Sequence, residues 1–156
     1  MRVYLDSSVV LVYLYGEFSE EERFPPTQSL FAAISSRKVE GAVSFYLFPE
    51  LYGYVAEKWP ADDVSEVVRL GLVQLLSLPL LVKPFLERER LSLWQHRLQL
   101  LDISDVGHAG MALEANCDAI ITYDYHFGKL VERIPVWTPE ECLAVLEQAE
   151  RENERD

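Results

Sequence analysis

Short apolar runs alternate with longer amphipathic segments along the chain, and this alternation predicts its secondary structure. The short runs are rich in branched and aromatic side chains and are bounded by polar residues, glycine or proline, which is typical of buried strands. We expect strands at residues 2–5, 41–44, 80–83, 118–122 and 134–137.

The longer segments carry apolar residues at helical spacing, and residues that begin or stop helices set their expected ends. Pro49 suits the first turn of the third helix, Thr27 and Ser104 suit the N-caps of the second and sixth, and either Asp62 or Asp63 caps the fourth. We expect helices at residues 7–15, 27–37, 49–59, 64–76, 87–100 and 105–116 and from residue 139 onward, with loops at 17–26 and 123–129.

Strands that alternate with helices in this way predict an α/β fold. Because the strands are short and apolar, we expect a three-layer α/β/α arrangement with a short, mainly parallel central sheet that is covered on both faces. The length of 156 residues suits one domain, expected over residues 1–148 and followed by a polar tail at 149–156 that frays. Ligands of such sheets bind beyond the carboxyl ends of the strands, so polar residues at those ends are the candidates for function.

The charge balance argues against one class of function. The chain carries 14 Lys and Arg against 26 Asp and Glu, a net charge of −12, whereas a protein that coats DNA by neutralising phosphates is usually basic. An enzyme whose carboxylates hold metal ions is compatible with this balance, since bound cations supply local positive charge.

Composition and hydropathy also indicate where the protein works. An apolar share of 49% excludes disorder as the main state. No apolar run is long enough to span a bilayer, and the first residues contain Asp6 and no cleavage site, so we expect a cytoplasmic protein without membrane contact. Cys117 and Cys142 lie in different segments without a metal-binding pattern and are expected to be buried thiols in a reducing compartment.

Four acidic residues lie at expected strand ends or helix starts. Asp6 and Asp124 follow the first and fourth strands, while Glu50 and Asp105 lie in the first turns of helices. Carboxylates about 4 Å apart repel each other by about 4 kcal/mol even at an effective dielectric of roughly 20, so a cluster of them indicates a divalent cation. All-oxygen ligation suits Mg²⁺ or Mn²⁺ rather than zinc. Taken singly, each acid has an ordinary explanation as a residue that favours a helix start or a turn.

Five short blocks of sequence occur in order over nearly the whole chain. The blocks are Leu5-Asp6-Ser7-Ser8-Val9, Ser44-x5-Glu50, Ser104-Asp105-x6-Ala112, Asp118-Ala119-Ile120-Ile121-Thr122-Tyr123-Asp124-x2-Phe127 and Val136-Trp137-Thr138-Pro139-Glu140-Glu141. Together they resemble the landmarks of the PIN-domain family, and they are most similar to the VapC-like ribonuclease toxins of bacteria and archaea.

The resemblance implies a metal-dependent endoribonuclease that hydrolyses RNA phosphodiester bonds and is the toxin of a type II toxin–antitoxin pair. It implies Mg²⁺ or Mn²⁺ as the cofactor, a homodimer, and an antitoxin partner whose arm lies across the site. Supporting hydroxyl groups that orient carboxylates or water are then those of Ser7 or Ser8 and of Thr122. The catalytic and metal-binding acids are then Asp6, Glu50, Asp105 and Asp124.

The residues of this set are expected to differ in role. Asp6 is the expected central ligand because a strand end holds it rigidly, while Glu50 ligates the metal or accepts a proton from the attacking water; one or two metals are compatible with the set. A catalytically silent PIN-like interaction module is the alternative, which the low basic content favours and the intact acid set opposes. Gly107 and Gly110 also favour it, since each weakens its expected helix by about 1 kcal/mol unless it allows close packing. An aspartyl phosphatase is set aside because position 8, two residues after Asp6, is serine.

Other polar residues have more ordinary explanations. We expect structural or solvent-exposed roles for the histidines His96, His108 and His126, the acids Asp102 and Asp118, and the basic residues Lys83, Arg88, Arg90 and Arg97. Of the histidines, His126 follows Asp124 in a loop and is the one placed to contact substrate. Tyr123 and Tyr125 flank Asp124 and are the aromatic residues best placed to contact a base.

Overall fold

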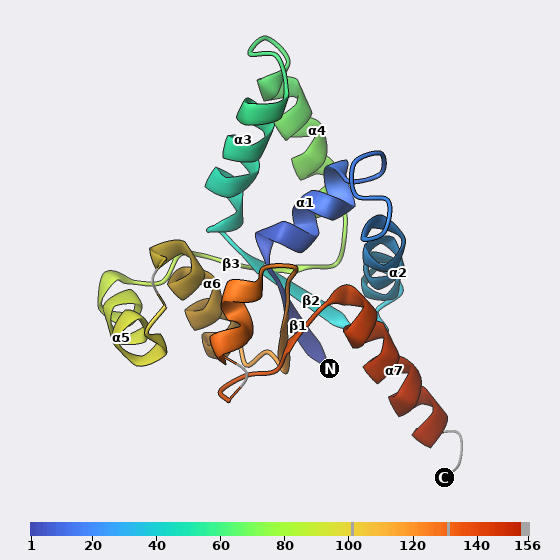
Figure 1. Cartoon of the computed structure of the whole chain (residues 1–156), viewed down its shortest axis with the longest axis vertical. Helices are drawn as coiled ribbons and strands as arrows, with labels where there is room; N and C mark the ends of the chain where they lie inside the picture. The colour runs from blue at the N-terminus through green and yellow to red at the C-terminus, as the bar shows by residue number, and fades with distance from the viewer. Residues whose placement is uncertain (101, 131, 154–156) are drawn as a thin grey trace.

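The computed structural model describes residues 1–100, 102–130 and 132–153, and its centre is a five-stranded sheet (Figure 1). The strands are β1 (Arg2–Leu5), β2 (Glu40–Ser44), β3 (Leu81–Lys83), β4 (Ala119–Ile121) and β5 (Val136–Trp137), in the spatial order β3-β2-β1-β4-β5. Every strand pair in the sheet is parallel. The chain therefore builds outward from β1 in both directions, and in such sheets ligands bind at the carboxyl ends of the strands beside the point where the strand order reverses.

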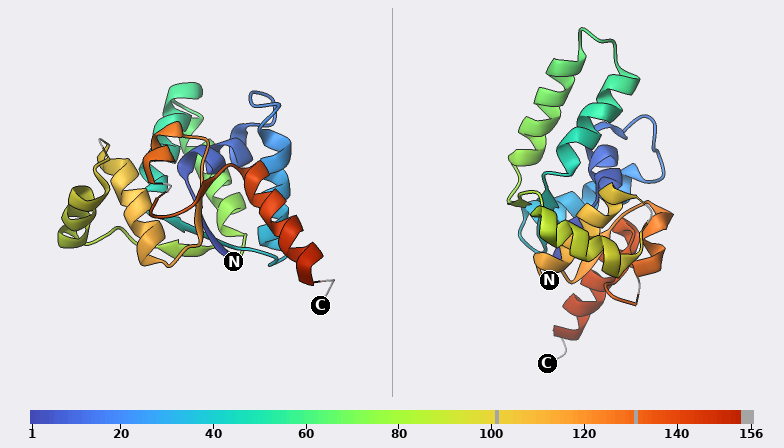
Figure 2. Two further views of the ribbon diagram at one scale, coloured as in Figure 1. Left: turned by 60° about the horizontal axis from the view of Figure 1, so that its bottom comes forward. Right: turned by 90° about the vertical axis from the view of Figure 1, so that its left-hand side faces the viewer.

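Helices cover both faces of the sheet (Figures 1 and 2). The helices are α1 (Ser7–Tyr15), α2 (Phe24–Ser35), α3 (Leu47–Lys58), α4 (Val64–Leu76), α5 (Arg88–Leu98), α6 (Ile103–Glu114), the 3₁₀ helix η1 (Tyr125–Leu130) and α7 (Pro139–Asn153). Val3 and Leu5 of β1 pack into the apolar core that α1, α2 and α7 share, whereas Tyr4 packs into the core on the opposite face with α5 and α6. The predicted three-layer α/β/α architecture is thus confirmed.

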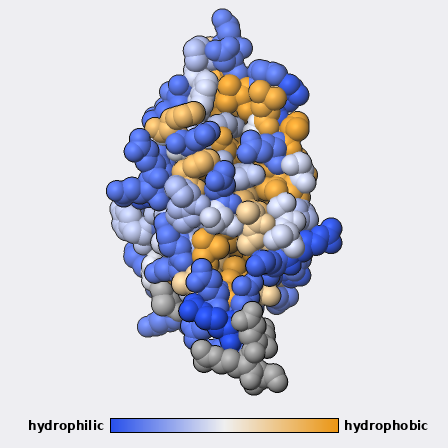
Figure 3. Space-filling view, turned by 90° about the vertical axis from the view of Figure 1, so that its right-hand side faces the viewer, coloured by the Kyte–Doolittle hydropathy of each residue, from blue (hydrophilic) through white to orange (hydrophobic). Residues whose placement is uncertain are grey.

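Helices α3 and α4 form a hairpin that projects from one end of the sheet (Figure 2, right). A small third core of Leu51, Val55 and Val64 holds the hairpin together and packs against α1. The outer side of α4 is also partly apolar, because Leu70, Val73 and Leu76 are exposed. Figure 3 shows apolar side chains gathered near this end of the molecule on one face.

Three helices begin earlier than the sequence predicted. α2 starts at Phe24 and takes Pro25 and Pro26 into its first turn, where the missing proline N–H groups would lack a partner in any case. Thr27 is therefore not an N-cap; it is fully buried, and its hydroxyl lies 3.0 Å from the Tyr123 hydroxyl.

The sixth helix also has a different cap from the one expected. Asp102, not Ser104, is the N-cap of α6, and its carboxylate accepts a hydrogen bond of 2.7 Å from the Ser104 N–H. This leaves the Ser104 hydroxyl free to donate to Glu50 across the site. The third helix likewise starts two residues early, at Leu47, and a 3₁₀ helix replaces part of the loop expected at 123–129.

The two glycines of α6 allow close packing rather than weakening the fold. A Cβ added at Gly107 would lie 2.6 Å from the Tyr46 ring, and one added at Gly110 would lie 2.9 Å from the Trp94 ring. Both glycines thus bring α6 against aromatic side chains from other elements, which removes one reason for expecting an inactive domain.

The C-terminal helix is longer than expected. Residues 149–153, assigned from the sequence to a polar tail, continue α7, and the rest of that tail, 154–156, lies outside the described residues. That residues 1–148 form one nuclease domain stays a prediction. Within the part of the chain that the structure describes, no helix combines the length and the apolar character needed to cross a membrane.

Candidate functional site

Asp6 and Asp124 lie close together because their strands are neighbours. β1 and β4 pair in parallel with Leu5 opposite Ile121, so the residues that follow each strand leave the sheet side by side. The Thr122 hydroxyl joins the two segments: it donates to the Asp6 carboxylate at 2.9 Å and accepts from the Asp124 N–H at 2.8 Å.

Asp6 is held rigidly in this position. It is the N-cap of α1 and is 3% exposed. One of its carboxylate oxygens accepts hydrogen bonds from the Ser8 hydroxyl at 2.7 Å and the Ser8 N–H at 3.2 Å, besides that from Thr122. The Ser8 hydroxyl also accepts from the Tyr123 N–H at 3.0 Å, which ties α1 to the segment after β4. Of the two serines expected as helpers, Ser8 is the one that contacts Asp6.

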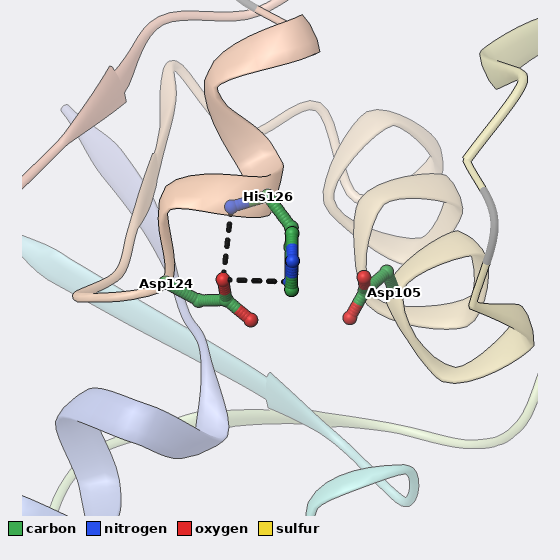
Figure 4. Close-up of side chains that lie close together, drawn as sticks. All are labelled: Asp105, Asp124 and His126. Carbon is green, nitrogen blue, oxygen red and sulfur yellow. Dashed lines mark hydrogen bonds and ion pairs between the residues drawn. The ribbon is translucent and has the colours of Figure 1, made fainter.

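Asp105, Asp124 and His126 form a group with the spacing of metal ligands (Figure 4). Each offers one ligand atom, and these atoms all lie within 4.8 Å of one another. The His126 ring stands between the two carboxylates; its Nδ1 atom lies 3.1 Å from Asp124 Oδ1, and its backbone N–H donates to the same oxygen at 2.9 Å. The group lines a cavity of about 550 Å³ together with Leu100, Asp102 and Lys129.

The pKa of Asp105 reflects the concentration of negative charge in this cavity. Partial burial and the charges of Asp102, Asp124 and Asp6 raise the pKa of Asp105 from 3.8 to about 6, although nearby His126 lowers it in part. A carboxylate whose neighbours disfavour its ionisation is relieved by a cation. The donor set therefore fits a divalent ion, and its imidazole nitrogen suits Mn²⁺ better than Mg²⁺, which takes almost only oxygen ligands.

Glu50 lies beside this group but outside it. Its carboxylate accepts hydrogen bonds from Ser7 and Ser104, the residues next to Asp6 and Asp105 respectively, and His108 Nε2 lies 3.3 Å from Glu50 Oε2. Burial would raise the pKa of Glu50, but the hydrogen bonds and charge of His108 and the two serine hydroxyls outweigh it and hold the pKa at about 2. A carboxylate with so low a pKa is a weak base at neutral pH, which favours a charge or ligand role over proton acceptance.

The structure thus brings Asp105 and Asp124 into one ligand group, with Asp6 and Glu50 held next to it. His126 joins them, although the sequence offered only its spacing of two residues from Asp124. His108, also set aside from the sequence, contacts Glu50. Its signal was its position three residues after Asp105, on the same face of an expected helix.

Comparison with known proteins identifies the architecture. No protein-family model and no curated protein matches the chain. VapBC2 from Rickettsia felis, solved bound to a DNA fragment from its promoter, matches with a TM-score of 0.62 at 12% identity, over 87% of this chain and 97% of that one. This chain has a VapC-like PIN fold.

Two further solved structures share this VapC-like PIN fold. VapC20 from Mycobacterium tuberculosis, described as a sarcin–ricin loop cleaving toxin, matches with a TM-score of 0.61 at 11% identity, over 81% of this chain and 92% of that one. FitAcB from Neisseria gonorrhoeae matches with a TM-score of 0.59 at 18% identity, over 88% and 97% of the respective chains. At these identities the likeness concerns the fold, and the chemistry of the site depends on the geometry above.

Proposed function

We propose that this protein is a metal-dependent endoribonuclease that hydrolyses RNA phosphodiester bonds and acts as the toxin of a type II toxin–antitoxin pair. The observation that carries the proposal is the ligand group of Asp105, Asp124 and His126 at the carboxyl edge of the sheet. The fold supports it, since a structural neighbour, VapC20, is described as a toxin that cleaves the sarcin–ricin loop.

The metal ligands in this proposal are Asp105, Asp124 and His126, and Asp6 adds negative charge beside them. A bound Mg²⁺ or Mn²⁺ ion supplies activation of water and neutralisation of phosphate charge. Thr122 and Ser8 keep Asp6 oriented by hydrogen bonds, so that its carboxylate does not need to reorganise when substrate binds. Lys129 lines the same cavity and places a positive side chain where an RNA phosphate enters.

Glu50 completes the acidic site from the side of α3. Ser7 and Ser104 donate to its two carboxylate oxygens and fix its orientation. Its low pKa keeps it ionised, so its proposed role is to attract the cation and to accept a hydrogen bond from water rather than to take up a proton.

The proposal includes an antitoxin and a second copy of the chain as partners. Several neighbours are VapBC structures, and one of them is described as a member of a family of toxin–antitoxin systems, which supports an antitoxin for this chain. The exposed apolar residues of α4, Leu70, Val73 and Leu76, support a homodimer formed through that helix. Cys142 is buried, Cys117 is half-buried and both are free thiols, which supports a cytoplasmic location, where thiols stay reduced.

The test is divalent-dependent cleavage of two labelled RNA probes, a sarcin–ricin loop hairpin and an unstructured oligonucleotide. We expect the purified full-length protein to cut RNA with Mn²⁺ or Mg²⁺ and not with EDTA. Asp105→Asn and Asp124→Asn should each lower the rate by more than about 100-fold, because changes in outer residues of metal sites alone cost roughly 10- to 100-fold. Asp62→Asn, an exposed turn residue between α3 and α4, is the matched control and should cleave at the normal rate.

Two results would contradict the proposal. If the wild-type protein cuts neither RNA with any divalent ion, the chain is the catalytically silent interaction module considered above. If cleavage persists unchanged in Asp124→Asn, the activity belongs to a contaminating nuclease or to another site.

A further inference from the structure

A buried chain of hydrogen bonds runs from β2 to Glu50 and has no part in the ligand group described above. Tyr4 is 0% exposed and His108 is 1% exposed. The Tyr4 hydroxyl lies 2.5 Å from the Ser44 hydroxyl and 2.8 Å from His108 Nδ1. The other ring nitrogen, Nε2, lies 3.3 Å from Glu50 Oε2. This network of hydrogen bonds therefore joins β1, β2, α6 and α3 through four side chains.

The direction of the last hydrogen bond follows from its partners. An ionised carboxylate only accepts hydrogen bonds, so His108 Nε2 carries a hydrogen and donates a hydrogen bond to Glu50. In the neutral ring Nδ1 accepts from the Tyr4 hydroxyl, and in the charged ring Nδ1 donates to Tyr4 instead. The Nε2–H group faces Glu50 in both states, so this contact does not depend on the charge of His108.

Packing prevents the His108 ring from turning away. The ring meets Tyr4 edge to face, with centroids 5.8 Å apart, and its centroid lies 5.7 Å from that of the Tyr46 ring. Tyr46 can approach because Gly107 has no side chain in its path. Ser7 and Ser104 donate through hydroxyl groups that rotate, whereas the imidazole presents its N–H group in one fixed direction.

We propose that His108, oriented by Tyr4, is a positioning residue that fixes the Glu50 carboxylate beside the metal centre. The inference rests on the proposed metal centre, but not on which RNA is cut. His108 lies one turn after Asp105 on α6, so it ties the position of Glu50 to the helix that carries a metal ligand. Residues that orient metal-site groups in this way typically contribute about 10- to 100-fold to metal affinity or activity.

The test measures the dissociation constant of Mn²⁺ from the full-length protein by electron paramagnetic resonance of the free ion. Three variants, His108→Gln, His108→Asn and His108→Phe, are all uncharged and so differ mainly in the donor that they present. The Gln amide reaches the position of Nε2, the Asn amide reaches that of Nδ1, and Phe supplies only the ring. We expect Gln to bind Mn²⁺ about tenfold more tightly than Phe, with Asn resembling Phe. Equal dissociation constants for Gln and Phe would overturn the proposal.

A double-mutant cycle separates positioning of Glu50 from a general structural role. In a Glu50→Gln background, His108→Phe should weaken Mn²⁺ binding no further, because the carboxylate that it orients is absent. Losses that multiply in full would show that His108 acts elsewhere and would overturn the proposal. Thr27→Val is the control: it removes the hydrogen bond between the buried Thr27 side chain and Tyr123, and should leave Mn²⁺ affinity unchanged.

A substitute variant and the behaviour of the wild type cover the remaining outcomes of this test. If the His108 variants do not fold, Tyr4→Phe serves in their place, because it removes the hydroxyl that orients Nδ1. It should weaken Mn²⁺ binding in the wild-type background but not in the Glu50→Gln background. Unchanged binding in both backgrounds overturns the proposal. A wild-type protein that binds Mn²⁺ but cuts no RNA refutes the proposed ribonuclease and leaves His108 to be judged by affinities alone. Failure of the wild type to bind Mn²⁺ refutes both.

Discussion

Replacing Asp105 with asparagine should stabilise the metal-free protein at neutral pH. The pKa of Asp105 rises from 3.8 to about 6 because burial and the charges of Asp102, Asp124 and Asp6 oppose its ionisation. A shift of about two units corresponds to about 3 kcal/mol at 1.36 kcal/mol per unit. Asp105 is only half-buried, so solvent screening reduces this to about 1 kcal/mol. The wild-type carboxylate also interacts favourably with the first turn of α6, and the loss of this interaction in the variant reduces the gain by a few tenths of a kcal/mol, roughly.

The sign of the effect depends on pH. Because the folded state binds the Asp105 proton more tightly than the unfolded state does, its stabilising contribution is fully present below about pH 4 and is lost as the pH rises to about 6. Above that range the ionised side chain destabilises the metal-free fold. The asparagine side chain of the variant does not ionise, so the gain in the free energy of unfolding should be small near pH 4.5 and reach about 1 kcal/mol near pH 7.5.

Urea unfolding in EDTA, followed by tryptophan fluorescence at the two pH values, measures this gain. Asp62→Asn in the exposed turn is the control and should change the stability little at either pH. Saturating Mn²⁺ should reverse the order, because only the wild type keeps both carboxylates of the ligand group. The prediction is wrong if the asparagine variant is less stable than the wild type in EDTA near neutral pH, or if its gain in stability does not depend on pH.

Three further predictions concern other parts of the molecule. Gly107→Ala should destabilise the fold by about 1–3 kcal/mol, because its Cβ would lie 2.6 Å from the Tyr46 ring, whereas Gly53→Ala in α3, with nothing within 4 Å, should stabilise it by up to about 1 kcal/mol; urea unfolding checks both. Tyr4→Phe should lower the free energy of unfolding by about 1–3 kcal/mol, since it leaves buried polar groups of Ser44 and His108 unpaired, and a cost below about 0.5 kcal/mol contradicts this. His126→Gln should weaken Mn²⁺ binding more than Mg²⁺ binding in calorimetric titrations, because an imidazole nitrogen suits Mn²⁺ better; equal losses would contradict this preference, and an unchanged Mn²⁺ affinity would exclude His126 as a ligand.

The sheet and its layers could be predicted because their signals are local. Each strand is a short apolar run, each helix has its own periodicity, and parallel order follows from their alternation. The helix starts were harder to predict, because long-range contacts decide them. Thr27 bonds to Tyr123 rather than capping α2, and the Ser104 hydroxyl bonds to Glu50 rather than capping α6.

The candidate site likewise contains residues that local sequence signals predict and residues that only long-range contacts bring into place. Position at a strand end or helix start predicted that Asp6, Asp105 and Asp124 lie near one another. The charges of Asp6 and Asp124 raise the pKa of Asp105, which reflects that proximity. His126 and His108 lie at neither kind of position, and their only signal in the sequence is their spacing from Asp124 and Asp105. His126 joins the ligand group because a turn after Asp124 folds its ring back, and His108 contacts Glu50 because α6 packs closely against Tyr46.

The most direct test of the metal centre is a crystal of the protein soaked in Mn²⁺ and measured for anomalous scattering. We expect a peak bonded to Asp105, Asp124 and His126, with Asp6 and Glu50 facing it. A peak elsewhere would show that the ion binds at a different site. No peak at a Mn²⁺ concentration that fills other cation sites in the crystal would show that this group binds no ion.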